Sequence, residues 1–219
     1  MSHPSASSDD DPLGERPPTS HERLAGQPWD ASYRNGPAPW DIGRPQPAVE
    51  RLASQGRFAG PVLDAGCGTG ENALLVASLG VPVLGVDVAE TALAIARAKS
   101  EARGVEAVFE AVDALRLERL GRRFHTVLDC GLFHSFDDDE RLRYVAGLAE
   151  VTEHGGTLYV LCFSDQGVET GPHPVSRQQL MAPFGPGDAW QVAAIDADRV
   201  QTRFHDGGAP AWLATLTRT

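Results

Sequence analysis

Short, nearly continuous apolar runs alternate along this chain with longer segments in which apolar residues recur at helical spacing. A strand without a polar face is buried on both sides, as in a parallel sheet that helices cover on both faces. The pattern therefore predicts an α/β fold with a Rossmann-like, doubly wound sheet. We expect strands at 61–65, 81–87, 106–114, 124–130 and 157–163, and helices at 71–80, 90–104 and 139–153.

The predicted helix over 139–153 and the C-terminal segment complete this pattern. In the helix, Leu142, Val145 and Leu148 form one apolar stripe, with acidic residues in the first turn. The segment 190–218 contains two strand-like runs joined by an Asp-Gly-Gly turn, which predicts a hairpin. The sheet is thus expected to be mostly parallel, with a C-terminal antiparallel hairpin strand.

Composition and charge restrict the kind of partner. Acidic residues outnumber basic ones by 30 to 19, giving a formal net charge of -11, which argues against nucleic acid as a partner. Apolar runs are too short to cross a bilayer, and the N-terminal segment does not resemble a secretory signal. The three cysteines are far apart and fit neither a disulfide framework nor a zinc site. We therefore expect a cytoplasmic protein without a metal or a membrane partner, either a monomer or a homodimer.

The stretch "VLDAGCGTG" over 62–70 ends the first predicted strand with an aspartate and three alternating glycines. Glycines at Gly66, Gly68 and Gly70 would let a ligand approach the main chain closely, although tight strand-to-helix turns also use glycine. Asp64 precedes the first of them by two residues.

Acidic residues also stand at the ends of the following strands. Asp87, followed by Val88, is placed to accept hydrogen bonds from the hydroxyls of a ribose. Asp113, followed by Ala114, can accept from an exocyclic amine such as that of adenine, and Asp129 ends the fourth strand. Each acid alone could equally be a loop or helix cap. Together they predict a nucleoside-binding edge of the sheet.

The motifs "VLDAGCGTG", "VLGVDVAE" and "FEAVDAL" resemble the successive signature motifs of class I S-adenosylmethionine-dependent methyltransferases. The resemblance covers about 61–163. It implies that S-adenosylmethionine is the cofactor, that the glycine loop passes its methionine part, and that Asp87 holds the ribose while Asp113 contacts adenine. Asp64 and Asp129 would then lie beside the cofactor, and methyl transfer would be the activity.

Two alternatives remain open at this point. Gly68, Gly70 and Ala73 satisfy a permissive dinucleotide pattern, which would make the chain a nicotinamide-dependent oxidoreductase. That pattern gives Asp113 no role and would bring a diphosphate close to the negative charge of Asp64. The other alternative is a regulator that binds S-adenosylmethionine without turnover.

The stretches "PWDIGRPQPAVERL" and "DCGLFHSF" resemble methyltransferases of the thiol and thiopurine type and relatives that act on heteroaromatic hydroxyl or nitrogen groups. By that resemblance Trp40 would lie against the cofactor and Arg44 would bind its carboxylate. Trp40 could instead be a core anchor beside a proline turn. The expected substrate is a small aromatic, heterocyclic or thiol molecule, methylated on sulfur, oxygen or nitrogen.

Candidate catalytic and substrate-binding residues follow the fourth strand and lie in the two flanking segments. His134 is the best-placed general base for a neutral hydroxyl, although a lone histidine is often structural. Tyr33, Phe133 and Phe136 could form apolar walls, and His173 offers a further contact. We expect a disordered tail at 1–26 and one methyltransferase domain at 27–219. Within it we expect an N-terminal lid and helix at 27–56, a cofactor-binding core at 61–163, and a substrate loop, helix and terminal hairpin at 164–219.

Overall fold

The computed structural model describes residues 16–167, 169–185 and 189–219. A seven-stranded sheet with the order β3-β2-β1-β4-β5-β7-β6 forms its centre. The first five strands are parallel, and β7 runs antiparallel to both β5 and β6. The predicted mostly parallel sheet with its terminal hairpin is confirmed. The strands are β1 (Val62–Ala65), β2 (Val83–Asp87), β3 (Val108–Ala111), β4 (Phe124–Cys130), β5 (Thr152–Phe163), β6 (Trp190–Val200) and β7 (Ala209–Arg218).

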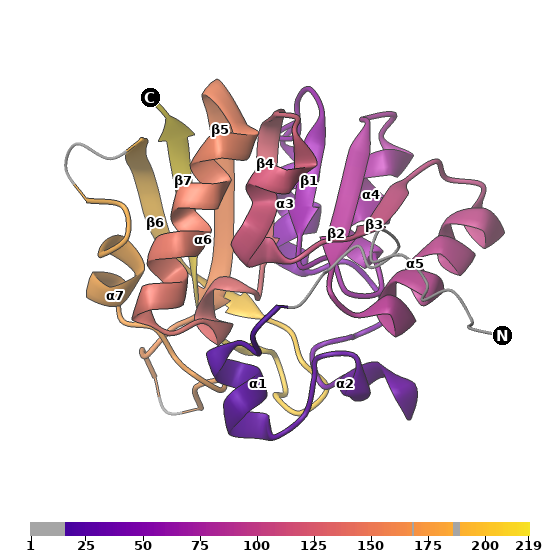
Figure 1. Ribbon diagram of the computed structural model, residues 1–219, viewed down its shortest axis with the longest axis horizontal. Helices are drawn as coiled ribbons and strands as arrows, with labels where there is room; N and C mark the ends of the chain where they lie inside the picture. Colours follow the sequence, from indigo (N-terminus) through magenta and orange to yellow (C-terminus); the bar gives the residue numbers. More distant parts are fainter. Residues whose placement is uncertain (1–15, 168, 186–188) are drawn as a thin grey trace, which may run out of the picture.

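Helices cover both faces of this sheet, and each face has its own apolar core (Figure 1). On one face pack α3 (Pro47–Ser54), α4 (Glu71–Ser78) and α5 (Glu90–Arg103). On the other face pack α6 (Asp138–Val151), α7 (Arg177–Met181) and the 3-10 helices η1 (Ala114–Leu120) and η2 (Phe133–Ser135). The all-apolar strands are therefore buried on both sides, as their sequences predict.

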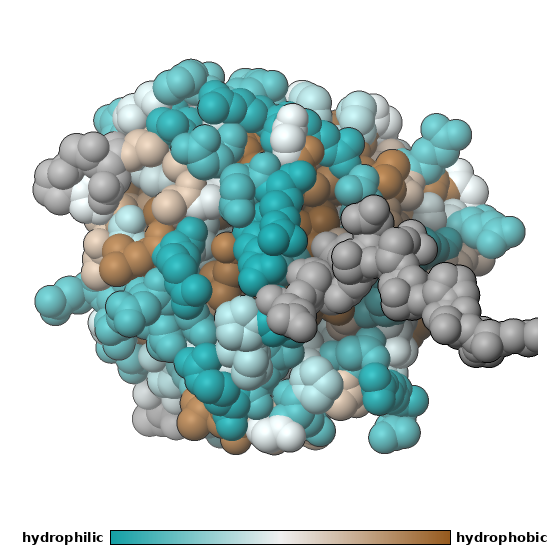
Figure 2. Space-filling view, in the orientation of Figure 1, coloured by the Kyte–Doolittle hydropathy of each residue, from teal (hydrophilic) through white to brown (hydrophobic). Residues whose placement is uncertain are grey.

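The helix α6 corrects one detail of the predicted apolar stripe. Its buried face contains Tyr144, Val145 and Leu148, whereas Leu142 is 56% exposed. Leu142 lies beyond the edge of the stripe, and Arg141 takes the buried position instead, with its guanidinium over the ring of Phe133. Figure 2 shows that the side chains over this face of the molecule are mainly hydrophilic, with smaller hydrophobic areas between them.

The N-terminal segment packs beneath the carboxyl ends of the parallel strands. It contains α1 (Ser20–Ala25) and α2 (Ala31–Arg34), which lie below the lower edge of the sheet in Figure 1. The prediction of a disordered tail over 1–26 is wrong for 16–26, and 1–15 lie outside the described residues. Thr19 and Glu22 form a capping box at the start of α1, which satisfies backbone groups that would otherwise be unpaired.

The helix α1 is also attached to the body of the protein. Glu140 of α6 is 2% exposed and accepts hydrogen bonds from the Ser20 backbone N–H at 2.8 Å and the Ser20 hydroxyl at 2.5 Å. Arg23 forms an ion pair with Asp137 at 3.2 Å. Among the described residues, each helix is too short or too polar to span a membrane.

Candidate functional site

A cavity of about 400 Å³ opens at the carboxyl ends of the parallel strands. The loops after β1, β2 and β4 line one side, and the N-terminal segment 16–46 lines another. Residues 172–173 and 200–205 complete the wall. The strand order reverses between β1 and β4, and open α/β sheets bind their ligands at such a switch point.

The glycine loop after β1 forms the floor of this cavity. Gly66 and Gly68 line it, with φ values of +74° and +53° that favour glycine. A Cβ atom at Gly66 would lie 3.0 Å from the side chain of Leu132, and one at Gly68 would lie 3.1 Å from the Tyr33 hydroxyl. Side chains are therefore excluded here by backbone conformation and by space.

Gly70 has a different reason for being glycine. It does not line the cavity, and a Cβ atom there would lie 2.8 Å from Ala96 and from the ring of Phe109. Gly70 allows the start of α4 to pack against α5 and β3. The structure does not bring this predicted cofactor residue to the cavity.

Asp64 lies beneath the glycine loop and outside the cavity lining. Asp64 is 1% exposed, and among the described residues its carboxylate oxygens have no partner at normal hydrogen-bond geometry, although the nearby Ala73 backbone N–H lowers its pKa. Burial, with a smaller contribution from the nearby charge of Asp129, raises the pKa of Asp64 to about 7. An unpaired buried carboxylate is stabilised by a cation, so this position suits a ligand that carries positive charge.

Asp129 is fully buried and also lies outside the lining. Its Oδ1 accepts hydrogen bonds from the backbone N–H groups of Leu132, at 2.9 Å, and Phe133, at 3.3 Å. Burial, partly offset by the hydrogen bonds from these N–H groups, raises the pKa of Asp129 to about 6. Asp129 therefore shapes the loop after β4 rather than facing a ligand directly.

Asp87 and Val88 line the cavity after β2. The Asp87 carboxylate accepts hydrogen bonds from the backbone N–H groups of Gly68 and Ala89, both at 2.9 Å. Burial raises the pKa of Asp87, and these N–H groups lower it. Each carboxylate oxygen has a second acceptor position, so the side chain can hold the glycine loop and still accept from a ligand hydroxyl.

Asp113 and Ala114 line the same side of the cavity after β3. Asp113 is also the N-cap of η1, since its Oδ1 accepts from the Leu115 N–H at 3.0 Å. Its Oδ2 lies 3.8 Å from Nε of Arg116. Asp113 therefore both caps η1 and lines the cavity.

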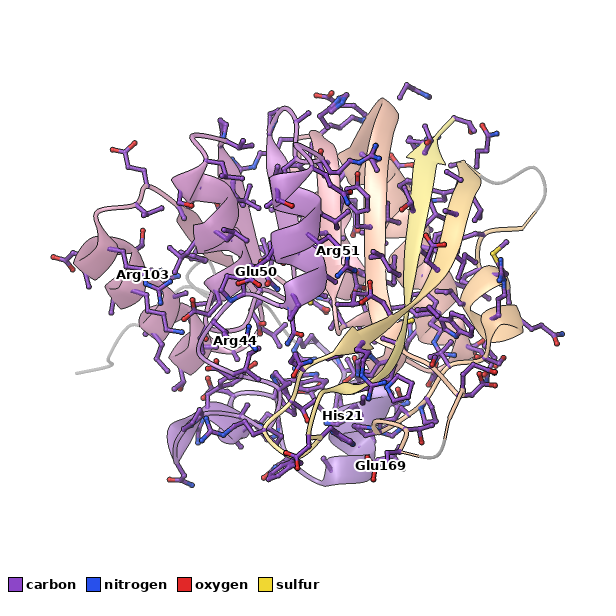
Figure 3. All side chains as sticks on the ribbon, turned by 180° about the vertical axis from the view of Figure 1, so that it is seen from behind. His21, Arg44, Glu50, Arg51, Arg103 and Glu169 are labelled. Atoms are coloured by element: carbon purple, nitrogen blue, oxygen red, sulfur yellow. The ribbon has the colours of Figure 1, made fainter. Side chains whose placement is uncertain are left out.

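The aromatic N-terminal segment covers the glycine loop. Nε1 of Trp40 donates to the Tyr33 hydroxyl at 2.9 Å, and Trp29 meets Trp40 edge to face at 5.7 Å between ring centroids. Both predicted residues, Trp40 and Tyr33, line the cavity, but Tyr33 lies on the glycine loop. Arg44 lines the cavity and is exposed, and within the described residues it has no ion pair or side-chain hydrogen bond. Figure 3 shows Arg44 in the lower half of the molecule, as it shows His21.

Comparisons with known protein families and with individual proteins agree on the family of this chain. Residues 62–156 match the family described as "Methyltransferase domain". The chain is 35% identical to the 2-heptyl-1-hydroxyquinolin-4(1H)-one methyltransferase of Mycobacteroides abscessus, over 78% of each chain. The chain belongs to the class I S-adenosylmethionine-dependent methyltransferases.

Two further relatives cover most of the methyltransferase chain. The structure reported as "Conversion of a Disulfide Bond into a Thioacetal Group during Echinomycin Biosynthesis" is 36% identical, with a TM-score of 0.78 over 87% of this chain and 91% of that one. The probable thiol methyltransferase 2 of Arabidopsis thaliana is 27% identical over 72% of each chain. The cofactor is S-adenosylmethionine, so the nicotinamide and non-catalytic alternatives are set aside.

The cavity of the methyltransferase suits this cofactor chemically. Glycine leaves room along the loop, and unpaired oxygens of Asp64 lie beneath it, where a sulfonium or ammonium charge would stabilise them. As the motif resemblance implies, Gly66 and Gly68 would then lie along the methionine part of the cofactor. Asp87 would bind the ribose, and Asp113 would contact the adenine. The rest of the lining would be available to a substrate, and we call it the substrate half of the cavity; it includes His21, Trp29, His134, Phe163 and His173.

In the substrate half, His134 follows β4 and lies in η2. Its ring is 4.4 Å from the ring of Phe163 between centroids, and it lines the cavity with His173. Burial, with smaller contributions from nearby His173, Arg141 and His21, lowers the pKa of His134 to about 3. The imidazole is neutral at physiological pH.

Phe133 corrects the predicted apolar wall. It is fully buried, stacks on Phe184 with ring centroids 6.2 Å apart, and does not line the cavity. Successive residues of η2 point in different directions, so His134 faces the cavity while Phe133 enters the core. Phe136, the other phenylalanine predicted for this wall, does line the cavity.

The sequence analysis missed several cavity residues of the methyltransferase. The predicted tail supplies Arg16, Thr19 and His21, and the β6–β7 connection supplies Phe204 and others. A usable signal was present in the tail, since Thr19 and Glu22 have capping-box spacing and indicate a helix start. No comparable local signal exists for the β6–β7 connection. The unpredicted residues of the lining include Arg16, Thr19, His21, Trp29, Asp41, Thr69, Asn72, Leu132, Ser135, Phe163, Pro172, Thr202, Phe204 and His205.

Proposed function

We propose that this methyltransferase transfers the methyl group to an oxygen, nitrogen or sulfur atom of a small aromatic heterocycle, with an aromatic hydroxyl as the preferred acceptor. One observation carries the proposal: the substrate half of the cavity combines aromatic rings, among them Trp29 and Phe163, with the neutral imidazole of His134. Flat apolar rings suit a flat substrate, and a neutral imidazole suits a hydroxyl. The hydroxyquinolinone methyltransferase relative supports the same substrate class.

A thiol is the second candidate acceptor, which the thiol methyltransferase relative favours. A thiol or an acidic hydroxyl is already partly ionised near neutral pH and needs little help with proton removal. Among the described residues, Arg16 of the cavity lining and Arg141 beside His134 are already engaged with carboxylates, so they are less available to a permanently anionic molecule. Arg16 is paired with Glu22, and Arg141 with Asp138.

The residues of the chain would act mainly by positioning. Methyl transfer is an in-line displacement at carbon, so the chain has to hold the acceptor atom behind the methyl group, and a hydroxyl acceptor also has to release its proton, to His134 or to water. S-adenosylmethionine supplies the activated methyl group. Gly66, Gly68 and Asp87 would fix the cofactor, and the N-terminal segment would exclude water from the reacting atoms. Orienting two reactants in this way is worth about 7 to 11 kcal/mol in favourable cases.

His134 would orient the acceptor hydroxyl by hydrogen bonding. A pKa of about 3 makes the imidazole a weak proton acceptor, so its strongest contribution is to hold the hydroxyl in line with the methyl group. His134 could remove the proton fully only if its pKa rises during the reaction, when the positive charge of the sulfonium is lost. The role of His134 as a general base therefore stays a hypothesis, which the methylation rate of the His134→Gln variant tests.

We also propose that the methyltransferase is a cytoplasmic protein. All three cysteines are unpaired, which supports a reducing, cytoplasmic environment. Cys67 and Cys130 line the cavity, but burial raises the pKa of both thiols, so neither is an activated nucleophile.

The test is methylation of a panel of aromatic compounds with S-adenosylmethionine that carries a labelled methyl group. The panel contains hydroxyquinolines, hydroxyquinolones, phenols and aromatic thiols, and mass spectrometry of the products identifies the methylated atom. Labelled product from hydroxyl-bearing heterocycles is the expected result. Product from aromatic thiols alone would contradict the preference for a hydroxyl, and product from none of the panel would contradict the substrate class.

A further inference from the structure

Three histidines meet in the substrate half of the cavity. His21 of α1, His134 of η2 and His173 of the loop after β5 all line it, and we call them the histidine cluster. The rings of His21 and His173 meet edge to face with centroids 5.5 Å apart. These residues are far apart in the sequence and come together only through the packing of α1 beneath the sheet.

The histidine cluster differs from the other described histidines in its hydrogen bonding. His125 pairs with Glu153, His154 with the Thr219 backbone oxygen, and His205 with the Thr202 hydroxyl. In the described part of the chain, Nδ1 of His21 and Nδ1 of His134 are buried without a partner. An unpaired buried polar atom is costly, so these two rings are suited to receive hydrogen bonds from a ligand or to donate them.

The position of the His21 ring is fixed by its surroundings. The ring stacks on Trp29 with centroids 4.1 Å apart and an interplanar angle of 8°. The neighbouring Glu22 accepts a 3.2 Å hydrogen bond from the Trp29 N–H and a 2.9 Å one from the Thr19 N–H, which holds both ends of the segment. A ring that is held in place and left without a hydrogen bond is preorganised for a ligand.

The charges around the cluster favour a neutral ligand group. Burial and the neighbouring His173 lower the pKa of His21, while Glu22 raises it, and Glu22 is itself bonded to Arg16. From α6, Arg141 faces His134 and lowers its pKa. Within the described residues no group of three His, Cys, Asp or Glu side chains is arranged to hold a metal ion. Neutral imidazoles pair well with hydroxyl and carbonyl groups, which carry no charge.

We propose that His21 is a substrate-binding residue, and that with His134 it selects aromatic hydroxyl compounds that carry a ring carbonyl as a second hydrogen-bonding atom. One ring would bind the hydroxyl that is methylated, and the other would bind the carbonyl. This inference rests on the proposed function and narrows its substrate class. It assigns the discrimination among aromatic hydroxyl compounds to a residue of α1, in the segment that the sequence predicted as a tail.

The test compares two probes in the presence of saturating S-adenosylhomocysteine, so that binding is measured without turnover. The first probe is 3-hydroxyquinolin-4(1H)-one, with a hydroxyl and a ring carbonyl. The second is 2-naphthol, with fused rings and a hydroxyl but no second polar atom. Titration calorimetry gives the affinity of the wild-type chain and of His21→Phe, which keeps a ring to stack on Trp29 but has no nitrogen. The matched control is His154→Phe, because His154 is exposed near the amino end of β5.

His21→Phe is expected to lower the affinity for the quinolone about tenfold, which corresponds to one lost hydrogen bond. Its affinity for 2-naphthol should change less than twofold. His154→Phe is expected to change neither. In the double variant His21→Phe, His134→Phe the preference for the quinolone should disappear. His21→Gln, which restores a polar side chain, should recover part of the preference. Unchanged affinity for S-adenosylhomocysteine shows that the variants are folded.

Two outcomes would overturn the inference. One is an equal loss for both probes in His21→Phe, which would assign His21 a purely structural role, and the other is no loss for either probe. A wild-type chain that methylates neither probe nor any other aromatic hydroxyl contradicts the proposed function itself. If the wild-type chain methylates both probes and His21→Phe still prefers the quinolone to 2-naphthol as strongly as the wild type does, only this inference is contradicted.

Discussion

The backbone N–H of Gly68 donates a 2.9 Å hydrogen bond to Oδ2 of Asp87, which joins the glycine loop after β1 to the acid that ends β2. The two strongest cofactor motifs in the sequence are therefore parts of one hydrogen-bonded unit. Asp87 therefore has a structural role in addition to its proposed role in binding the cofactor, and a change in either residue should affect the position of the other.

Asp87→Ala is expected to lower the affinity for S-adenosylhomocysteine by about 10- to 100-fold, because a hydrogen bond to a charged acceptor contributes about 1.5 to 3 kcal/mol to binding. The loss should be the same for every methyl acceptor, since the residue would act on the cofactor. Calorimetric titration measures it, with Asp139→Ala on the exposed first turn of α6 as the control. Unchanged affinity in Asp87→Ala would contradict the cofactor role of Asp87.

Gly68→Ala is expected to reduce both stability and cofactor affinity, whereas Gly104→Ala should reduce stability alone. Both glycines have positive φ, +53° and +62°, which costs a non-glycine residue about 1 to 2 kcal/mol. Only at Gly68 would the added Cβ atom crowd another group, the Tyr33 hydroxyl at 3.1 Å, while nothing lies within 4 Å at Gly104. Thermal unfolding and S-adenosylhomocysteine titration separate the two effects.

Adding Tyr33→Phe to Gly68→Ala should recover part of the lost affinity, because it removes the crowded oxygen and leaves the ring. The single variant Tyr33→Phe is the control for the lost hydrogen bond from Trp40. No recovery in the double variant would mean that the backbone conformation of Gly68, and not the contact with Tyr33, determines cofactor binding.

Asp64 should make the stability of the ligand-free chain depend on pH. Its pKa is about 7 in the folded chain and 3.8 in the unfolded chain, so between these values the folded chain binds a proton that the unfolded chain releases. The contribution is present below about pH 4 and is lost as the pH rises through 7. Asp64→Asn removes this dependence. Denaturant unfolding from pH 5 to 8 should therefore favour the variant increasingly over the wild type as the pH rises, and parallel curves would show that the Asp64 pKa is not raised.

His134→Gln is expected to leave the affinity for S-adenosylhomocysteine nearly unchanged while slowing the methylation of a neutral hydroxyl. The loss should reach about 10² to 10⁴ if His134 accepts the proton in the transition state. A thiol that is ionised at the assay pH should lose much less. Single-turnover rates with one substrate of each kind decide between the roles, since equal losses on both would leave His134 with positioning alone.

The sequence by itself determined the parallel sheet, its C-terminal hairpin and the positions of Asp87 and Asp113 at the cavity. These features follow from local patterns, because a buried parallel strand must be apolar along its whole length and its ligand-facing acids must come directly after it. The glycine pattern was less specific. Gly66 and Gly68 line the cavity, whereas Gly70 allows α4 to pack against α5, and no local rule distinguishes close approach to a ligand from close approach to a helix.

Only the tertiary structure decided which side chains share the substrate half of the cavity. His21, His134 and His173 lie more than 35 residues apart in sequence and meet because Glu140 of α6 anchors α1 beneath the sheet. The same packing buries His134 and lowers its pKa, which a pattern of residues cannot indicate. Contacts between distant segments depend on how elements dock, and burial, pKa and the shape of a cavity are properties of the docked assembly rather than of any one stretch of sequence.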